Sequence, residues 1–169
     1  MAQVTGRGLP AANPVTIMPT IIAKDLTKEF PRSPLDELDG LPWLPRLIDK
    51  VRALKAGTLG EYSPYPCGGD RHFLSVVGVD GDQLKALIDS GADDTAIAGW
   101  VNANTTGGLE SRLAAYRETT VTPVTGELRV YLDGALAELK AARPELDTSK
   151  VDNFARLLCL EEGYPCPGL

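Results

Sequence analysis

The strongest candidates for chemistry are four charged residues within seven positions of the sequence. Asp49 lies three residues from Arg46 and three from Arg52, so on a helix it can pair with either guanidinium group. Such pairs contribute only about 0.2–0.5 kcal/mol each on an exposed helix, and a solvated charged face explains them as simply as a binding site does. The segment before the helix adds Arg32, and the segment after it adds Glu61 and Tyr62; these polar groups favour a binding site. We predict a ligand-binding site formed by Arg32, Arg46, Asp49, Lys50, Glu61 and Tyr62.

These residue types favour a small anionic or carboxylate-bearing ligand. The guanidinium group of arginine presents paired N–H donors that match the two oxygens of a carboxylate. The alternative function is a protein–protein interaction module or homodimer without catalysis. It would use the charged flank of the helix and the apolar segment from Ile17 to Ile22.

A second candidate for chemistry is Cys67. It precedes Asp70, which we predict to cap a helix, and a thiol near a helix N-terminus can become nucleophilic. The sequence fixes no general base beside it, so an inert loop cysteine is the simpler interpretation. The candidate catalytic residues are Cys67, Asp70 and Tyr62, and whether the protein is an enzyme stays open. His72 with Cys67 and Asp70 lacks a fourth ligand, so we predict no metal site, and no cofactor-binding motif is present.

One helix must position most of these groups. The apolar residues that recur at helical spacing are Leu44, Leu47, Ile48, Val51 and Leu54. Pro45 lacks an amide hydrogen and suits the first turn, whereas Gly57 suits a left-handed residue that ends a helix. The pattern predicts a central helix over about residues 45–56, with one face in a core.

The rest of the chain predicts an all-α fold, a single compact domain of six or seven helices around this central helix. Asp80 and Asp93 are expected to cap two of the helices. Leu128, Val130 and Leu132 alternate before Asp133-Gly134 as in a hairpin, but the alanine-rich segment that follows favours a helix. We divide the chain into an extended arm (1–24), a helical domain (25–162) and an irregular tail (163–169).

Several short motifs follow one another along the chain. They are Asp25-Leu-Thr, Pro31-Arg-Ser-Pro34, Leu44-Pro-Arg46, Asp49-Lys50, Arg52-Ala53, Gly60-Glu-Tyr62, and Cys67 with Asp70, Phe73 and Gly78. This series resembles a bacterial family catalogued as domain of unknown function five thousand and sixty-nine, from Asp25 to about Glu162. The resemblance implies a helical domain and no particular biochemistry. The chain departs from the family pattern around Cys67, where Pro66 precedes it and Gly68-Gly69 follows.

Composition narrows the classes of partner. The chain has 169 residues, 43% of them hydrophobic, and a formal net charge of -6. That charge repels phosphate backbones, so we expect no nucleic-acid partner. No run of about 18 apolar residues is present, so we expect no membrane-spanning segment. The three cysteines form no regular spacing and suit free thiols, which together with the absence of a recognisable signal peptide predicts a cytoplasmic protein.

Overall fold

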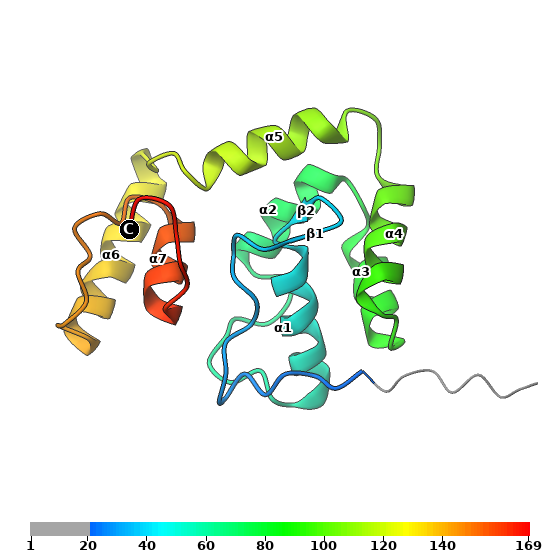
Figure 1. The fold of residues 1–169 in the computed structure, drawn as a ribbon, viewed down its shortest axis with the longest axis horizontal. Helices are drawn as coiled ribbons and strands as arrows, with labels where there is room; N and C mark the ends of the chain where they lie inside the picture. Colours follow the sequence, from blue (N-terminus) through cyan, green and yellow to red (C-terminus); the bar gives the residue numbers. More distant parts are fainter. Residues whose placement is uncertain (1–20) are drawn as a thin grey trace, which may run out of the picture.

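Seven helices and one very short hairpin account for the regular structure of the residues that the computed structural model describes, 21–169 (Figure 1). The all-α prediction is confirmed. The arm predicted at residues 1–24 lies mostly outside the described residues. The elements are β1 (Glu37–Leu38), β2 (Leu41–Pro42), α1 (Leu44–Ala56), α2 (Gly68–Val77), α3 (Gly81–Asp89), α4 (Asp94–Asn104), α5 (Leu109–Thr119), α6 (Gly126–Ala142) and α7 (Phe154–Glu162).

Helix α1 is the predicted central helix. Pro45 lies in its first turn, and Gly57 ends it with φ 74° while donating its N–H to the carbonyls of Ala53 and Leu54. The apolar face is fully buried at Leu44, Leu47, Ile48 and Val51. On the opposite side Arg46, Asp49 and Lys50 are buried as well. The alternative of a solvated charged face is therefore wrong for these three residues.

The hairpin that precedes α1 was not predicted. Its strands pair antiparallel, with Leu38 opposite Leu41, and the turn between them is Asp39-Gly40 with φ angles of 50° and 74°. Two consecutive residues with positive φ match the type I′ turn, for which Asp-Gly is a favoured sequence. The turn reverses the chain so that Leu41 enters the core directly before α1.

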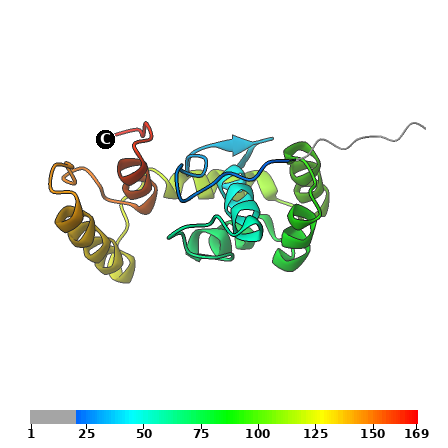
Figure 2. The ribbon, with the colours of Figure 1, turned by 90° about the horizontal axis from the view of Figure 1, so that it is seen from below.

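Two separate hydrophobic cores lie at different places along the molecule. The larger unites apolar residues of β2, α1, α2, α3, α4 and α5, between Leu41 and Tyr116. The smaller consists of Leu132, Leu139, Val151 and Leu157, from α6, α7 and the segment between them. In both views α6 and α7 form one end of the molecule, while α3 and α4 form the other end (Figures 1 and 2). Helix α5 packs in the larger core and leads toward α6 (Figure 1).

Several local expectations are settled by the helix boundaries. Asp80 and Asp93 accept hydrogen bonds from the backbone N–H groups of Gln83 and Ala96, so both predicted caps are confirmed. The hairpin alternative around Asp133-Gly134 is wrong, because both residues lie inside α6. None of the helices in residues 21–169 combines the length and the apolar character needed to cross a bilayer.

The burial of the α1 face predicts a strong effect of Val51→Asp. Val51 is 0% exposed, so the new carboxylate would be buried without a partner, at a cost of several kcal/mol against a total stability of about 5–15 kcal/mol. Val121→Asp is a matched control at a half-exposed position after α5 and should cost under about 1 kcal/mol. Thermal melts followed by circular dichroism compare the two. Equal melting temperatures would show that the face of α1 is assigned wrongly.

Candidate functional site

Three buried charged side chains on α1 each find a partner on another part of the chain. Arg46 is 2% exposed and Lys50 is 4% exposed, and Asp49 lies between them on the same side of the helix. A charge buried at this level persists only when it is paired and hydrogen-bonded. The three pairs together form a polar layer along α1, opposite its apolar face.

The Arg46 guanidinium group binds Glu162 at the end of α7. Its two terminal nitrogens donate to the two carboxylate oxygens at 2.7 and 2.6 Å, and one of them also donates to the Arg32 carbonyl at 3.1 Å. The Tyr62 hydroxyl donates to the same carboxylate at 3.0 Å. Burial and then the charge of Glu162 raise the pKa of Tyr62 well above its usual value, so the phenol stays protonated. Glu162 is thus held by two side chains from the other end of the sequence.

The rings of Trp43 and Tyr62 complete the surroundings of this guanidinium group. Its central carbon lies 5.6 Å from the Trp43 ring centroid and 5.7 Å from that of Tyr62. These distances suit cation–π attraction, which is strongest where water is excluded. The Arg46 guanidinium group therefore donates hydrogen bonds to oxygens and also lies close to two aromatic rings.

Asp49 pairs with Arg32 rather than with its neighbours on α1. The Arg32 side chain donates to both Asp49 oxygens at 2.8–3.1 Å, and its backbone N–H adds a bond of 2.9 Å. Arg32 also reaches Asp94 on α4 at 2.6 Å, and Arg52 binds the other oxygen of Asp94 at 2.7 Å. The predicted pairs from Asp49 to Arg46 and Arg52 are therefore wrong. Burial opposes ionisation of Asp94, but hydrogen bonds from Arg32 and Arg52 outweigh it and lower the Asp94 pKa.

Lys50 brings together the thiol of Cys67 and the carboxylate of Asp70. Its ammonium nitrogen lies 3.0 Å from the Cys67 sulfur and 3.3 Å from an Asp70 oxygen. That oxygen also accepts the Cys67 backbone N–H at 2.9 Å, and the other accepts the Trp43 indole N–H at 2.9 Å. Asp70 is 0% exposed and both of its carboxylate oxygens accept hydrogen bonds, whereas Cys67 is only partly buried.

The N-terminus of α2 is built around this carboxylate. Cys67, not Asp70, is the N-cap residue, and Asp70 reaches back to it from the third helical position. The expectation that Asp70 itself caps the helix is wrong, although the carboxylate does satisfy an N-terminal backbone donor. The two glycines of the first turn differ. A Cβ atom at Gly69 would overlap the Trp43 ring, but a Cβ atom at Gly68 would meet nothing within 4 Å.

The polar layer is balanced in charge. Five ion pairs join four cationic side chains to four carboxylates. The cations are Arg32, Arg46, Lys50 and Arg52, and the anions are Asp49, Asp70, Asp94 and Glu162. Each cation already has an internal counter-ion, so the interior of the layer offers little net attraction to a further anion.

The structure brings most of the predicted site residues together, but in two groups. Arg32, Arg46, Asp49 and Tyr62 belong to the arrangement around Glu162 and Asp94, whereas Lys50, Cys67 and Asp70 form the group at α2. Glu61 is exposed and makes no side-chain ion pair among residues 21–169. His72 stacks on Tyr116 at a ring distance of 5.1 Å. Among residues 21–169, no three His, Cys, Asp or Glu side chains converge as metal ligands.

Three residues of the polar layer were not identified by reasoning from the sequence. Glu162 is separated from Arg46 by 116 residues, and no local pattern links them. Asp94 directly follows the capping Asp93. Because one carboxylate is enough to cap a helix, the second acidic residue was the only sequence signal for the ion pairs that Asp94 makes. Trp43 directly precedes α1, and no local pattern indicates that its indole N–H donates to Asp70.

A comparison with protein families gives a match over residues 28–163, to the family described as Domain of unknown function (DUF5069). The chain belongs to this family. The matched region contains every charged residue of the polar layer, from Arg32 to Glu162, and also Cys67. DUF5069 carries no assigned activity, and no curated protein matches the chain.

Removal of Glu162 should destabilise the fold strongly. Glu162→Ala leaves the Arg46 charge buried without its partner, which typically costs about 3–5 kcal/mol. The adjacent Glu161 is exposed, so Glu161→Ala should cost less than about 1 kcal/mol. Urea denaturation of both variants gives the free energies of unfolding. A loss of similar size in both would contradict the buried pair.

The two glycines at the start of α2 should respond in opposite directions to alanine. Gly69→Ala forces a methyl group into the Trp43 ring and should cost about 1–3 kcal/mol as other overpacked sites do. Gly68→Ala adds a methyl group in open space and should be neutral or stabilising by up to about 1 kcal/mol. The midpoints of urea denaturation distinguish the two. Equal effects would mean that Trp43 does not pack on Gly69.

Proposed function

We propose that this protein binds and transforms a small anionic or carboxylate-bearing molecule, and that Cys67 reacts with it. The observation that supports this proposal is the 3.0 Å contact between the Lys50 ammonium group and the Cys67 sulfur, at the start of α2. Reactive cysteines occupy electropositive and partly exposed surroundings, and Cys67 is partly buried beside a lysine. Asp70 has the role of a positioning residue, because it holds Lys50 against the sulfur.

The other two cysteines differ from Cys67 in their surroundings. Cys159 is fully buried, and burial followed by a hydrogen bond with Cys166 raises its pKa to about 12. A buried thiol with so high a pKa is a poor nucleophile at neutral pH. Cys166 is partly buried in the C-terminal tail and is hydrogen-bonded to Cys159. Cys67 is therefore the thiol best prepared for nucleophilic attack.

An anionic group of the ligand would bind at the first turn of α2. The first N–H groups of a helix have no acceptor within the helix and point toward an anion placed there. Space is open beside Gly68, next to Cys67. We assign the anion-binding role to the backbone N–H groups of this turn, since Arg32, Arg46 and Lys50 are already paired with Asp49, Glu162 and Asp70. In this proposal the arginines, Asp49 and Tyr62 support the site through the polar layer.

The second candidate function is an interaction module without catalysis. It is favoured by α6, where Leu128, Val130 and Tyr131 are exposed to solvent. Large apolar side chains gathered on one exposed helix are typical of contact surfaces. This function does not depend on Cys67.

Two alkylating reagents of similar size, iodoacetate and iodoacetamide, test the reactive thiol. Cys67 should be alkylated faster than Cys166 in the folded protein. Because iodoacetate carries a carboxylate, its rate relative to iodoacetamide should be higher at Cys67 than at Cys166. Mass spectrometry of the two cysteine-containing peptides over time gives the four rates. No advantage of Cys67 with either reagent would refute the reactive thiol, and an advantage with iodoacetamide alone would refute the anionic ligand.

A double variant provides the matched control. Lys50→Met with Asp70→Asn removes both charges of the buried pair, so neither is left unpaired, and the fold should survive better than with either single change. Circular dichroism confirms folding before alkylation. The rate at Cys67 should fall toward that of Cys166. An unchanged rate in a folded double variant would show that Lys50 does not activate the thiol.

A further inference from the structure

The C-terminal tail, residues 163–169, runs back along α7 instead of continuing away from it (Figure 1). At its start, the backbone N–H of Tyr164 donates to the Cys159 carbonyl at 2.8 Å. Further along, the Pro167 carbonyl accepts a hydrogen bond of 3.1 Å from Arg156, which lies in the first turn of α7. The order of these contacts is reversed along the tail, so the tail is held against α7 at two places.

Two thiols meet between these two contacts. Cys166 lies in the tail between Tyr164 and Pro167, and its side chain is hydrogen-bonded to that of Cys159 on α7. Both thiols are free. Cys159 is 0% exposed, whereas Cys166 is only partly buried. The pair therefore has one sulfur that an external reagent can reach, and a second sulfur in contact with the first.

We propose that Cys159 and Cys166 form a redox-active dithiol, which a small disulfide such as oxidised glutathione converts to an intramolecular disulfide. The Cys166 thiolate attacks one sulfur of the oxidant, so a mixed disulfide forms and the first glutathione thiol leaves. Cys159 then loses its proton and attacks the Cys166 sulfur, and the second glutathione thiol leaves. The protein gives up two electrons and two protons, and the S–S bond of the oxidant is replaced by one between the two cysteines.

The tail has the freedom that this reaction needs. Two hydrogen-bonded thiols lie farther apart than the roughly 2.05 Å between the sulfurs of a disulfide, so one of them must move. Helix α7 is held by its own backbone bonds and by the pair of Arg46 with Glu162, whereas residues 163–169 form no helix or strand. Movement of Cys166 toward Cys159 therefore completes the bond without a change in α7.

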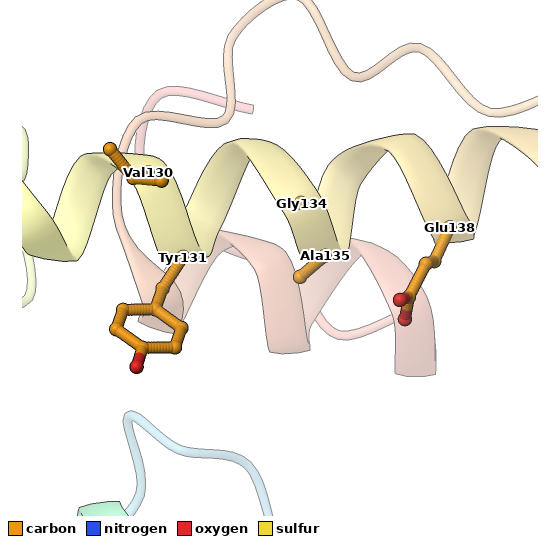
Figure 3. Close-up of a pocket in the computed structure, with 5 residues that line it drawn as sticks. All are labelled: Val130, Tyr131, Gly134, Ala135 and Glu138. Atoms are coloured by element: carbon orange, nitrogen blue, oxygen red, sulfur yellow. The ribbon is translucent and has the colours of Figure 1, made fainter.

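The dithiol is separate from the Cys67 site and from the exposed surface of α6. It includes neither Cys67 nor Lys50, so it does not depend on the chemistry proposed at α2. A hollow of about 360 Å³ on α6 is lined by residues of that helix alone (Figure 3). The lining residues are Val130, Tyr131, Gly134, Ala135 and Glu138. None of them is a cysteine, so Gly134 offers a position for a control thiol.

A bond between the two cysteines fixes the tail to α7 and so affects how α7 is attached to the body. The Tyr164 hydroxyl donates to the Pro31 carbonyl at 2.6 Å, which joins the tail to the segment before β1. Glu162, directly before the tail, binds Arg46 of α1. A disulfide restricts the separated state of the segments that it joins. Oxidation therefore makes the release of these contacts rarer.

Reaction of the full-length protein with oxidised glutathione under native conditions tests the dithiol. Cleavage after Arg156 releases residues 157–169, which contain both cysteines and no further Lys or Arg. After iodoacetamide treatment, mass spectrometry should find this peptide unalkylated, free of glutathione and lighter by two hydrogen atoms. Cleavage at the two glutamates between the cysteines should leave fragments that separate only on reduction. No reaction, a lasting glutathione adduct on Cys166, or a link to Cys67 would overturn the proposal.

Two variants separate the steps of the reaction. Cys159→Ala removes the buried thiol, so the reaction should stop with one glutathione on Cys166. Gly134→Cys keeps both native thiols and adds an exposed one on α6, where a Cβ atom meets nothing within 4 Å. This added thiol should retain its glutathione while residues 157–169 of the same molecule release theirs. Release from both places, or from folded Cys159→Ala, would show that Cys159 is not the resolving thiol.

Hydrogen exchange tests the effect of the disulfide on the attachment of α7. The α7 amides should exchange about tenfold more slowly after oxidation, because the disulfide removes open states in which the tail has left the helix. Exchange in α3, whose Leu84 and Ile88 belong to the larger core, should not change. Cys166→Ser, treated with the same oxidant, should show no change in α7. Equal α7 rates in the reduced and oxidised wild-type protein would overturn the effect on the attachment.

Discussion

The bidentate pair between Arg46 and Glu162 is the interaction on which the arrangement of this protein depends. It joins the central helix to the last helix, whose hydrophobic contacts belong mainly to a different core. Two charges taken out of water are costly, and such a pair is favourable only where further hydrogen bonds satisfy the groups around it. The second Arg46 contact, the bond from Tyr62 and the two flanking rings meet that requirement. Without them the same two charges would oppose folding.

Charge pairing also determines how the polar layer responds to acid. The pKa of Asp94 is lowered in the folded state, despite burial, by its bonds to Arg32 and Arg52. A carboxyl group of this kind contributes stability at pH values above its unfolded pKa, and the contribution is lost as pH falls through the folded pKa. Asp94 joins α4 to both α1 and the connector that carries Arg32. Acid should therefore loosen the contact between α4 and this connector while the apolar face of α1 remains packed.

The parts of the structure that were predictable from sequence are those that depend on neighbours in the chain. Pro45 and Gly57 delimit α1, and Asp80 and Asp93 cap their helices through bonds that span three residues. The Asp39-Gly40 turn also depends on neighbours, because this dipeptide is a recognisable signal for a hairpin. The pairing of the site was not predictable in this way. Arg46 and Asp49 carry nothing in their own helix that reveals partners at Glu162 and Arg32, and the local rule gave the wrong pairs.

The division into two cores implies that this protein does not open as a single unit. Residues of α6 and α7 share few apolar contacts with the body, and their attachment rests on α5, on Glu162 and on the bond from the Tyr164 hydroxyl to the Pro31 carbonyl. Amide hydrogens in such a segment exchange through a local opening that costs less free energy than global unfolding. The attachment of the C-terminal pair of helices to the body thus has its own stability, set mainly by a few polar bonds. Whatever lengthens or replaces those bonds changes how often this end of the molecule separates from the rest.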